Sequence, residues 1–240
     1  MPRIARIVGA GYPHHIVQRG NNREKVFLDR EDYERYLSFL ARYSEEKETA
    51  VLAYCLMPNH VHLLVIPSEE EALAKMMQGI TLCYTQYFNR KEGRTGRLWE
   101  CRYHSTVIDG DSYLWTVSKY IEKNPVRAAI VQRPEDYPYS SARAHIFGRN
   151  DPLLNGHLFD RSELNEYRTF MKSEEDKRFL EEIRKQTRLG KPLGDKGFLE
   201  TLSGRFGCSF SFRPKGRPTK KNQELRDREI REFRTKEFRD

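Results

Sequence analysis

The sequence predicts an α+β domain whose core is a ferredoxin-like βαββαβ unit with an antiparallel sheet. Two β-rich runs, residues 49–57 and 60–67, are separated only by Pro58-Asn59, which has turn character, so we expect neighbouring strands. Shorter β-rich runs lie at residues 14–18 and 105–108, and segments with helical spacing of apolar residues lie between the runs. The order strand, helix, strand, strand, helix, strand, helix contains the ferredoxin-like unit, in which helices cover one face of the sheet.

The first two helices are expected to begin at polar capping residues. A helix should run from Asp29 to about Lys47, because Asp29 or Asp32 can cap it and apolar residues recur at helical spacing after them. Ser68 followed by Glu71 has the capping-box pattern and predicts a second helix that reaches about residue 89.

A third helix should begin near Asp111 or Ser112 and run to Asn124, where Pro125 disfavours helical geometry at the preceding residue. The organisation predicted from these elements is a main domain over residues 1–148 and a helical extension over residues 149–212. A basic tail over residues 213–240, disordered or only conditionally helical, completes the chain.

Composition and charge narrow the class of protein. No stretch approaches the roughly 20 apolar residues of a membrane span, and the first residues lack the apolar core of a secretory signal, so a cytoplasmic location is expected. The four cysteines form no CxxC pair. Net charge is +8, and five of the eight excess positive charges fall in residues 213–240. A basic tail of this kind suits a polyanionic partner, although a solvated terminus explains it equally well.

Two short patterns have the chemistry of a metal-dependent site. His60 and His62 are two apart in a predicted strand, so both imidazoles leave the same face and can converge on one divalent ion. Tyr120 and Asn124 are four apart in the predicted third helix, which places a phenol and an amide on one helix face. Each pattern also has an ordinary structural interpretation: sheet histidines with backbone partners, a packed tyrosine, and an asparagine that ends a helix.

Longer stretches around these patterns strengthen them. Five blocks, in this order and at this spacing, resemble the REP-associated tyrosine transposases, which belong to the HUH endonucleases. The resemblance covers residues 11–148, and more loosely residues 181–202 and the GRPTK segment of the tail. The blocks are GYPHHIVQRGNNREKVF, AYCLMPNHVHLLV, NRKEGRTGRLWECRYHS, SKYIEKNPVRAAIV and DYPYSSARAHIFG.

This resemblance implies a function for each candidate residue. His60 and His62 match the HUH pair, Asn124 the third metal ligand carried by a helix, and Tyr120 the nucleophile. The implied activity is nicking and rejoining of single-stranded DNA beside REP-type hairpins, through a covalent 5′-phosphotyrosine and with Mg²⁺ or Mn²⁺. The implied protein works as a monomer or homodimer and has no membrane partner. Cys101 is a departure, because the family often has glycine there, but the substitution removes no chemical group.

Three basic or aromatic segments are candidate DNA contacts. The first is the polar loop after the first predicted strand, and the second mixes cations with rings on which bases could stack. The alternative interpretations are an ordinary turn for the first segment and a core aromatic beside solvated arginines for the second. The third segment is the basic tail. The candidate residues are Arg19, Asn21, Asn22 and Arg23; Arg94, Arg97, Trp99, Arg102 and Tyr103; and Arg217, Lys220 and Lys221.

Other interpretations remain open. His14 and His15 are adjacent in a predicted strand and face opposite sides, so at most one could reach the HxH pair, and both are interpreted as structural or close to DNA. A histidine-triad hydrolase needs a third alternating histidine, where this chain has Leu64. A DNA-binding repressor that kept the fold without the chemistry is the second alternative.

Overall fold

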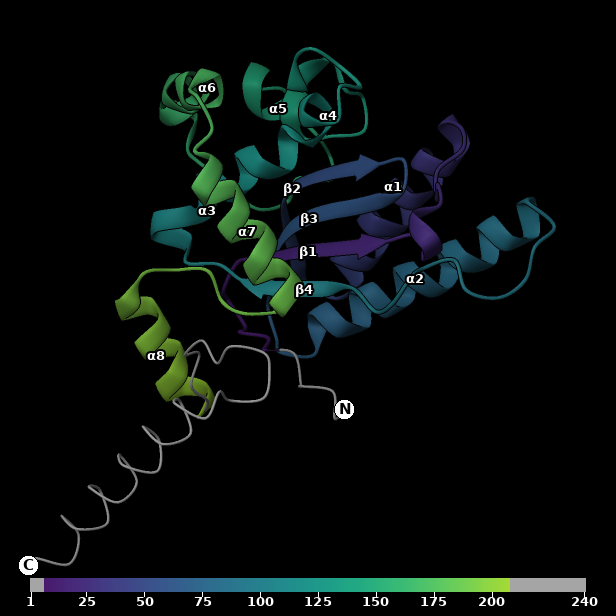
Figure 1. Cartoon of the computed structure of the whole chain (residues 1–240), viewed down its shortest axis with the longest axis horizontal. Helices are drawn as coiled ribbons and strands as arrows, with labels where there is room; N and C mark the ends of the chain where they lie inside the picture. Colours follow the sequence, from purple (N-terminus) through teal and green to yellow (C-terminus); the bar gives the residue numbers. More distant parts are fainter. Residues whose placement is uncertain (1–6, 208–240) are drawn as a thin grey trace, which may run out of the picture. The chain divides into compact units, whose positions relative to one another are not determined.

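A four-stranded sheet with the strand order β2-β3-β1-β4 lies at the centre of the computed structural model, which describes residues 7–207 (Figure 1). All neighbouring strands are antiparallel. This order confirms the predicted ferredoxin-like core. The strands are β1 (His14–Arg19), β2 (Thr49–Met57), β3 (His60–Pro67) and β4 (His104–Val107).

The hairpin of β2 and β3 has the boundaries that the sequence predicts, with Pro58-Asn59 as its turn. On the other side of β3, the central strand β1 pairs His15 with Leu64, Val17 with His62 and Arg19 with His60. Directly paired residues of an antiparallel sheet share a face. The odd-numbered residues of β1 therefore lie on the same face as the two predicted ligand histidines.

Helices α1 (Arg30–Glu46) and α2 (Ala72–Lys91) pack on the opposite face of the sheet. Asp29 and Asp32 cap α1 reciprocally, as predicted. The predicted capping box of α2 is wrong: α2 begins at Ala72 without a side-chain cap, and the Glu71 carboxylate instead pairs with Lys75 at 2.7 Å.

A second hydrophobic core lies between the other face of the sheet and the helices that follow β4. Its buried members include Tyr120, Ile121, Tyr167 and Ile183, which come from three of these helices. Figure 1 shows the helices that follow β4 grouped on that side of the sheet. The helices are α3 (Gly110–Glu122), α4 (Asn124–Arg127), α5 (Ala142–Phe147), α6 (Leu164–Lys172) and α7 (Lys177–Leu189), with α8 (Lys196–Phe206) after them; short 3-10 turns span Asn21–Arg23, Pro134–Asp136 and Arg161–Glu163.

Pro125 interrupts the third helix without ending the helical path. Helix α3 ends at Glu122, two residues earlier than predicted, and the single turn α4 continues from Asn124. Proline has no N–H to donate to the carbonyl four residues back. Asn124 supplies that donor, because its Nδ2 lies 3.1 Å from the Ile121 carbonyl oxygen and 3.2 Å from that of Tyr120.

The described residues all belong to one of the two units into which the chain divides, Met1–Cys208. The helical extension predicted from residue 149 onward is present as α6, α7 and α8, all within this unit. Between residues 7 and 207, no helix is both long enough and apolar enough to cross a bilayer. The predicted basic tail lies outside the described residues.

Candidate active site

A cavity of about 410 Å³ lies on the α3 side of the sheet. Strands β1, β3 and β4, helices α3, α4 and α7, and the loop before β4 all contribute to its wall. The four residues predicted for catalysis and metal binding converge in it. The lining residues are His15, Val17, Arg19, His60, His62, Glu100, Cys101, His104, Tyr120, Asn124, Arg184, Thr187 and Arg188.

The two histidines of the HxH pair are neighbours with different orientations. Their ring centroids are 4.9 Å apart and their planes meet at 76°, while the His62 and Tyr120 rings are 5.7 Å apart. Both histidines share one face because side chains alternate along β3. Helix α3 then brings Tyr120 over that face from a distant part of the sequence.

Each histidine has its Nδ1 engaged by another side chain. His60 Nδ1 lies 2.6 Å from Asn59 Oδ1, and His62 Nδ1 lies 3.0 Å from His15 Nε2. Metal-binding histidines commonly use one ring nitrogen for the ion and fix the other with a hydrogen bond. In both rings Nε2 is the nitrogen left for a ligand.

Asn124 has the complementary arrangement. Its Nδ2 donates to the backbone of α3, so Oδ1 is the atom of the amide left to face a partner. Two imidazole nitrogens and one amide oxygen suit a divalent ion. Among residues 7–207 no group of three or more His, Cys, Asp or Glu side chains is placed to hold a metal. His60, His62 and Asn124 line the same cavity, and their role as metal ligands stays a proposal, as does the metal itself.

Burial favours the neutral form of three histidines of the cavity, His15, His60 and His62. It lowers the pKa of His60 to about 4, with a further lowering from Arg19, and the pKa of His15 to about 3. Burial also holds the pKa of His62 well below its usual value, and His60 and His15 add to the effect. A buried ring avoids the charged form because that form loses its hydration. Neutral imidazoles keep the lone pair that a metal needs.

Arg127 fixes the surroundings of Tyr120. Its guanidinium lies 4.6 Å from the centre of the Tyr120 ring and donates to the Tyr120 carbonyl oxygen. It also pairs with Glu175 at 2.7 Å. Burial lowers the pKa of Arg127, but arginine remains charged at neutral pH. A cation thus lies beside the phenol that the sequence predicts as the nucleophile.

The residues that line the cavity without being assigned to the site from the sequence include His15, Arg184, Thr187 and Arg188. His15 was considered only as a structural or DNA-proximal residue. The other three share one face of α7, because they lie three and four positions apart. That spacing is visible in the sequence, but nothing in it shows that α7 packs against the sheet.

The first predicted DNA-contact segment begins in the cavity and continues onto the surface. Arg19 lines the cavity, whereas Asn21, Asn22 and Arg23 form a 3-10 turn after β1 with no buried residue. Asn22 and Arg23 have positive φ angles of 52° and 61°.

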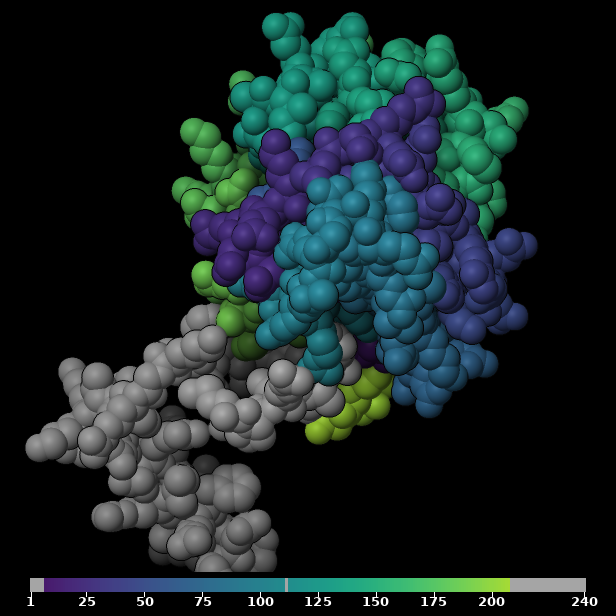
Figure 2. All heavy atoms as spheres, turned by 90° about the vertical axis from the view of Figure 1, so that its right-hand side faces the viewer, coloured from purple at the N-terminus to yellow at the C-terminus, as the bar shows by residue number. Residues whose placement is uncertain are grey.

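This turn adjoins the second predicted segment. The Asn21 backbone N–H donates to the Leu98 carbonyl oxygen at 2.8 Å, and Arg94 lies 3.8 Å from Glu24. Figure 2 views the molecule from the side on which this turn (purple) and the segment after α2 (teal) meet. The two predicted DNA-contact segments are therefore in contact with each other.

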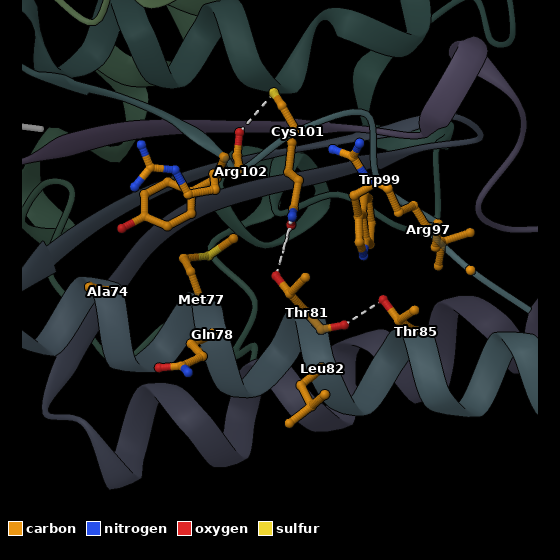
Figure 3. Close-up of a pocket in the computed structure, with 14 residues that line it drawn as sticks. Ala74, Met77, Gln78, Thr81, Leu82, Thr85, Arg97, Trp99, Cys101 and Arg102 are labelled. Atoms are coloured by element: carbon orange, nitrogen blue, oxygen red, sulfur yellow. Dashed lines mark hydrogen bonds between the residues drawn. The ribbon is translucent and has the colours of Figure 1, made fainter. Parts of the chain in front are cut away.

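Arg97, Trp99, Arg102 and Tyr103 line a second cavity of about 620 Å³, between α2 and residues 96–103 (Figure 3). Trp99 is only 5% exposed, and its ring centre lies 6.0 Å from that of Tyr84. Trp99 and Tyr103 are thus part of the core under α2, whereas Arg97 and Arg102 line the cavity without belonging to that core. DNA contact by these residues stays a prediction. Arg217, Lys220 and Lys221 lie outside the described residues.

Comparisons with known proteins relate this chain to transposases. The family model for IS200-like transposases matches residues 10–124, which include all four predicted site residues. A protein of Haemophilus influenzae described as a REP-associated tyrosine transposase is 27% identical over 129 residues, covering 45% of this chain and 73% of that protein.

A solved structure of a REP-associated tyrosine transposase bound to a REP hairpin superposes with a TM-score of 0.52. The match has 18% identity and covers 68% of this chain and 96% of that one, so it is a likeness of fold. The resemblance to REP-associated tyrosine transposases is thereby confirmed, and the IS200-like transposase model matches just under half of the chain, residues 10–124.

Proposed function

We propose that this protein nicks and rejoins single-stranded DNA beside REP-type hairpins, with Tyr120 as the nucleophile. The observation that supports this most directly is the convergence of Tyr120, His60, His62 and Asn124 in one cavity. The Tyr120 phenol oxygen bonds to the scissile phosphorus as the bond to the 3′ oxygen breaks, and that oxygen leaves as a 3′ hydroxyl. The DNA 3′ of the nick stays joined to Tyr120 through its 5′ phosphate. Attack by another DNA 3′ hydroxyl on this ester reverses the step and joins strands.

His60, His62 and Asn124 would hold Mg²⁺ or Mn²⁺, which when bound would polarise the scissile phosphate and offset the charge that develops on it. The protein's own groups prepare the site. The neutral imidazoles offer lone pairs, Asn124 presents its oxygen, and Arg127 holds the backbone of Tyr120 in place.

The charge of the cavity and the resemblance to the transposases both support DNA as the partner. Three arginines, Arg19, Arg184 and Arg188, line it, against the single carboxylate of Glu100. Phosphodiesters are attracted to such a surface, and the related structure was solved with a REP hairpin bound. A cytoplasmic location, where DNA is accessible, and a monomeric or homodimeric state remain predictions.

The test is covalent capture on labelled DNA that carries a hairpin and a single-stranded flank, with Mn²⁺ present. Denaturing gels should show the DNA 3′ of the nick attached to the protein and a free 3′ hydroxyl on the other fragment. Tyr120→Phe removes only the attacking oxygen and should abolish the adduct while keeping hairpin affinity. Tyr113→Phe is the matched control, because Tyr113 lies on the same helix but stacks on Phe179 at 5.2 Å.

Peptide mapping decides the assignment. An adduct on any tyrosine other than Tyr120 would show that the nucleophile is misassigned. Hairpin binding by the unaltered protein with no adduct under any divalent ion would instead support the alternative function, a non-catalytic DNA-binding protein.

A further inference from the structure

Helix α7 belongs to the helical extension, yet it contacts the catalytic face of the sheet. Thr187 is 7% exposed and its hydroxyl lies 3.1 Å from Nδ1 of His15 on β1. The other nitrogen of the same ring, Nε2, lies 3.0 Å from Nδ1 of His62 on β3. A chain of two hydrogen bonds therefore runs from α7 to a predicted ligand of the active site.

We propose that Thr187 is a positioning residue for the active site, which holds His62 through His15 in the tautomer that leaves His62 Nε2 unprotonated. This proposal rests on the proposed function, since it assigns Thr187 a role in preparing the same site.

The direction of the protons follows from the chemistry of the three groups. His15 and His62 are almost fully buried, so each ring is neutral and carries one proton. If His62 Nδ1 carries the proton, it donates to His15 Nε2, and His15 then donates from Nδ1 to the Thr187 oxygen. The opposite direction puts the His62 proton on Nε2, where it blocks ligation. A threonine hydroxyl can both donate and accept, and in the proposed arrangement Thr187 accepts the hydrogen bond from His15 Nδ1.

The geometry of the two rings supports a direct link. Their planes are within 10° of each other and their centroids are 5.2 Å apart. Val17, which is paired with His62 across the sheet, is apolar and offers no competing hydrogen bond. His15 is thus the side chain that reaches His62 Nδ1 from the neighbouring strand.

A nearby hydroxyl shows that proximity alone does not make this contact. Thr106 on β4 is the direct cross-strand partner of His15. Its buried Oγ1 has no hydrogen-bond partner among the described residues. The ring of His15 instead reaches the helix, 172 residues away in the sequence. Packing of α7 on the sheet needs only an apolar side chain, and Ile183 supplies one a turn earlier. The hydroxyl at position 187 is therefore explained by the histidine that it contacts.

The experiment compares Thr187→Val with Thr187→Ser in the full, metal-free chain. Valine keeps the shape and removes the oxygen, whereas serine keeps the oxygen. Long-range ¹H–¹⁵N NMR of the histidine rings reports the tautomer, and a His62→Gln variant assigns the signals. We expect His62 to be protonated at Nδ1 in the unaltered protein and in Thr187→Ser. In Thr187→Val the proton should move in part or wholly to Nε2.

A second readout is Mn²⁺ affinity, measured by electron paramagnetic resonance. Loss of the group that hydrogen-bonds a metal ligand typically costs 10- to 100-fold in affinity. Thr187 is one hydrogen bond further from the ligand, so Thr187→Val should weaken Mn²⁺ binding by up to roughly tenfold, the lower end of that range, and Thr187→Ser by much less. Thr201→Val, an exposed threonine of α8, is the control for the exchange itself. If Thr187→Val is too unstable to study, His15→Gln interrupts the same chain and should shift the His62 tautomer in the same way.

Two results would overturn the proposal. One is an unchanged His62 tautomer in Thr187→Val, or in His15→Gln if Thr187→Val is too unstable to study. The other is an equal shift in Thr187→Val and Thr187→Ser, which would mean that packing alone matters. The tautomer is read without metal or DNA. If the unaltered protein bound no Mn²⁺, the proposed metal would fail while the NMR comparison still decided the role of Thr187.

Discussion

Replacing Arg184 and Arg188 by glutamine should weaken binding of single-stranded DNA and reduce its dependence on salt. The two arginines lie four positions apart on α7 and both line the active-site cavity. Within the described residues, neither has a carboxylate within ion-pair distance. Their charges are therefore available to phosphates of a bound strand.

The size of the effect follows from counterion release. For single strands, the slope of log affinity against log salt is about −0.7 for each phosphate neutralised. If each arginine meets one phosphate, the double variant should have a slope smaller in magnitude by about 1.4. Between 50 and 200 mM salt, the unaltered protein should then lose about sevenfold more affinity than the variant does.

Fluorescence anisotropy with a labelled single-stranded oligonucleotide measures this slope. Arg178→Gln is the matched control, because Arg178 is an exposed arginine of the same helix that does not line the cavity. Equal slopes for the unaltered protein and the double variant would refute the inference that α7 meets the DNA backbone. An equal reduction in Arg178→Gln would show that the effect is one of general charge.

Four further outcomes are expected. Glu122→Ala should lower the free energy of unfolding, measured in urea, by about 3–5 kcal/mol, because the buried carboxylate accepts hydrogen bonds from Ser141 and Tyr167 and contacts His145. As a control, Glu34→Ala removes an exposed ion pair with Arg30 and should lower it by less than about 1 kcal/mol. EDTA should abolish nicking by the unaltered protein, and His60→Ala should not nick DNA even when Mn²⁺ is added. Nicking that survives EDTA would disprove the role of the metal. Deleting residues 213–240 should also flatten the salt slope, and an unchanged slope would show that the tail contributes no affinity. Stability should fall as pH drops from about 6.5 toward 4, because burial lowers the folded-state pKa of His14 to about 4, as it lowers those of His15, His60 and His62, and the unfolded chain takes up these protons first. A His14→Asn variant should lose less stability over this range, and an equal loss would exclude a contribution from His14.

The sheet was predictable because its signals are local. The β2–β3 hairpin was predicted to the residue, since two β-rich runs flank a two-residue turn. The two-residue spacing of His60 and His62 predicted that both lie on one face of the sheet, and the four-residue spacing of Tyr120 and Asn124 predicted that they lie on adjacent helical turns. The predicted capping box at the start of α2 was wrong because the Glu71 carboxylate pairs with Lys75 instead of capping the helix. A pattern of residue types does not show which of two possible pairings forms.

The rest of the site depended on contacts that no local pattern encodes. His15 reaches the site because β1 pairs with β3 in a register that places it opposite Leu64, and a shift of one residue would turn it to the other face. Thr187 reaches the site because α7 folds back over the sheet. Both facts depend on tertiary packing, which the spacing of residue types along the chain does not specify.

The helical extension has a structural reason to be part of the catalytic unit. Glu122 lies two residues after Tyr120 and is fully buried. Its carboxylate accepts hydrogen bonds from Ser141 at 2.6 Å and from Tyr167 on α6 at 3.0 Å. A chain that ended at residue 148 would lack Tyr167 and would also expose the surface of α3 that α6 covers. It would lack the α7 hydroxyl that contacts His15 as well. Contacts to the Tyr120 helix and, through His15, to His62 therefore come from residues beyond the segment that the transposase family model matches.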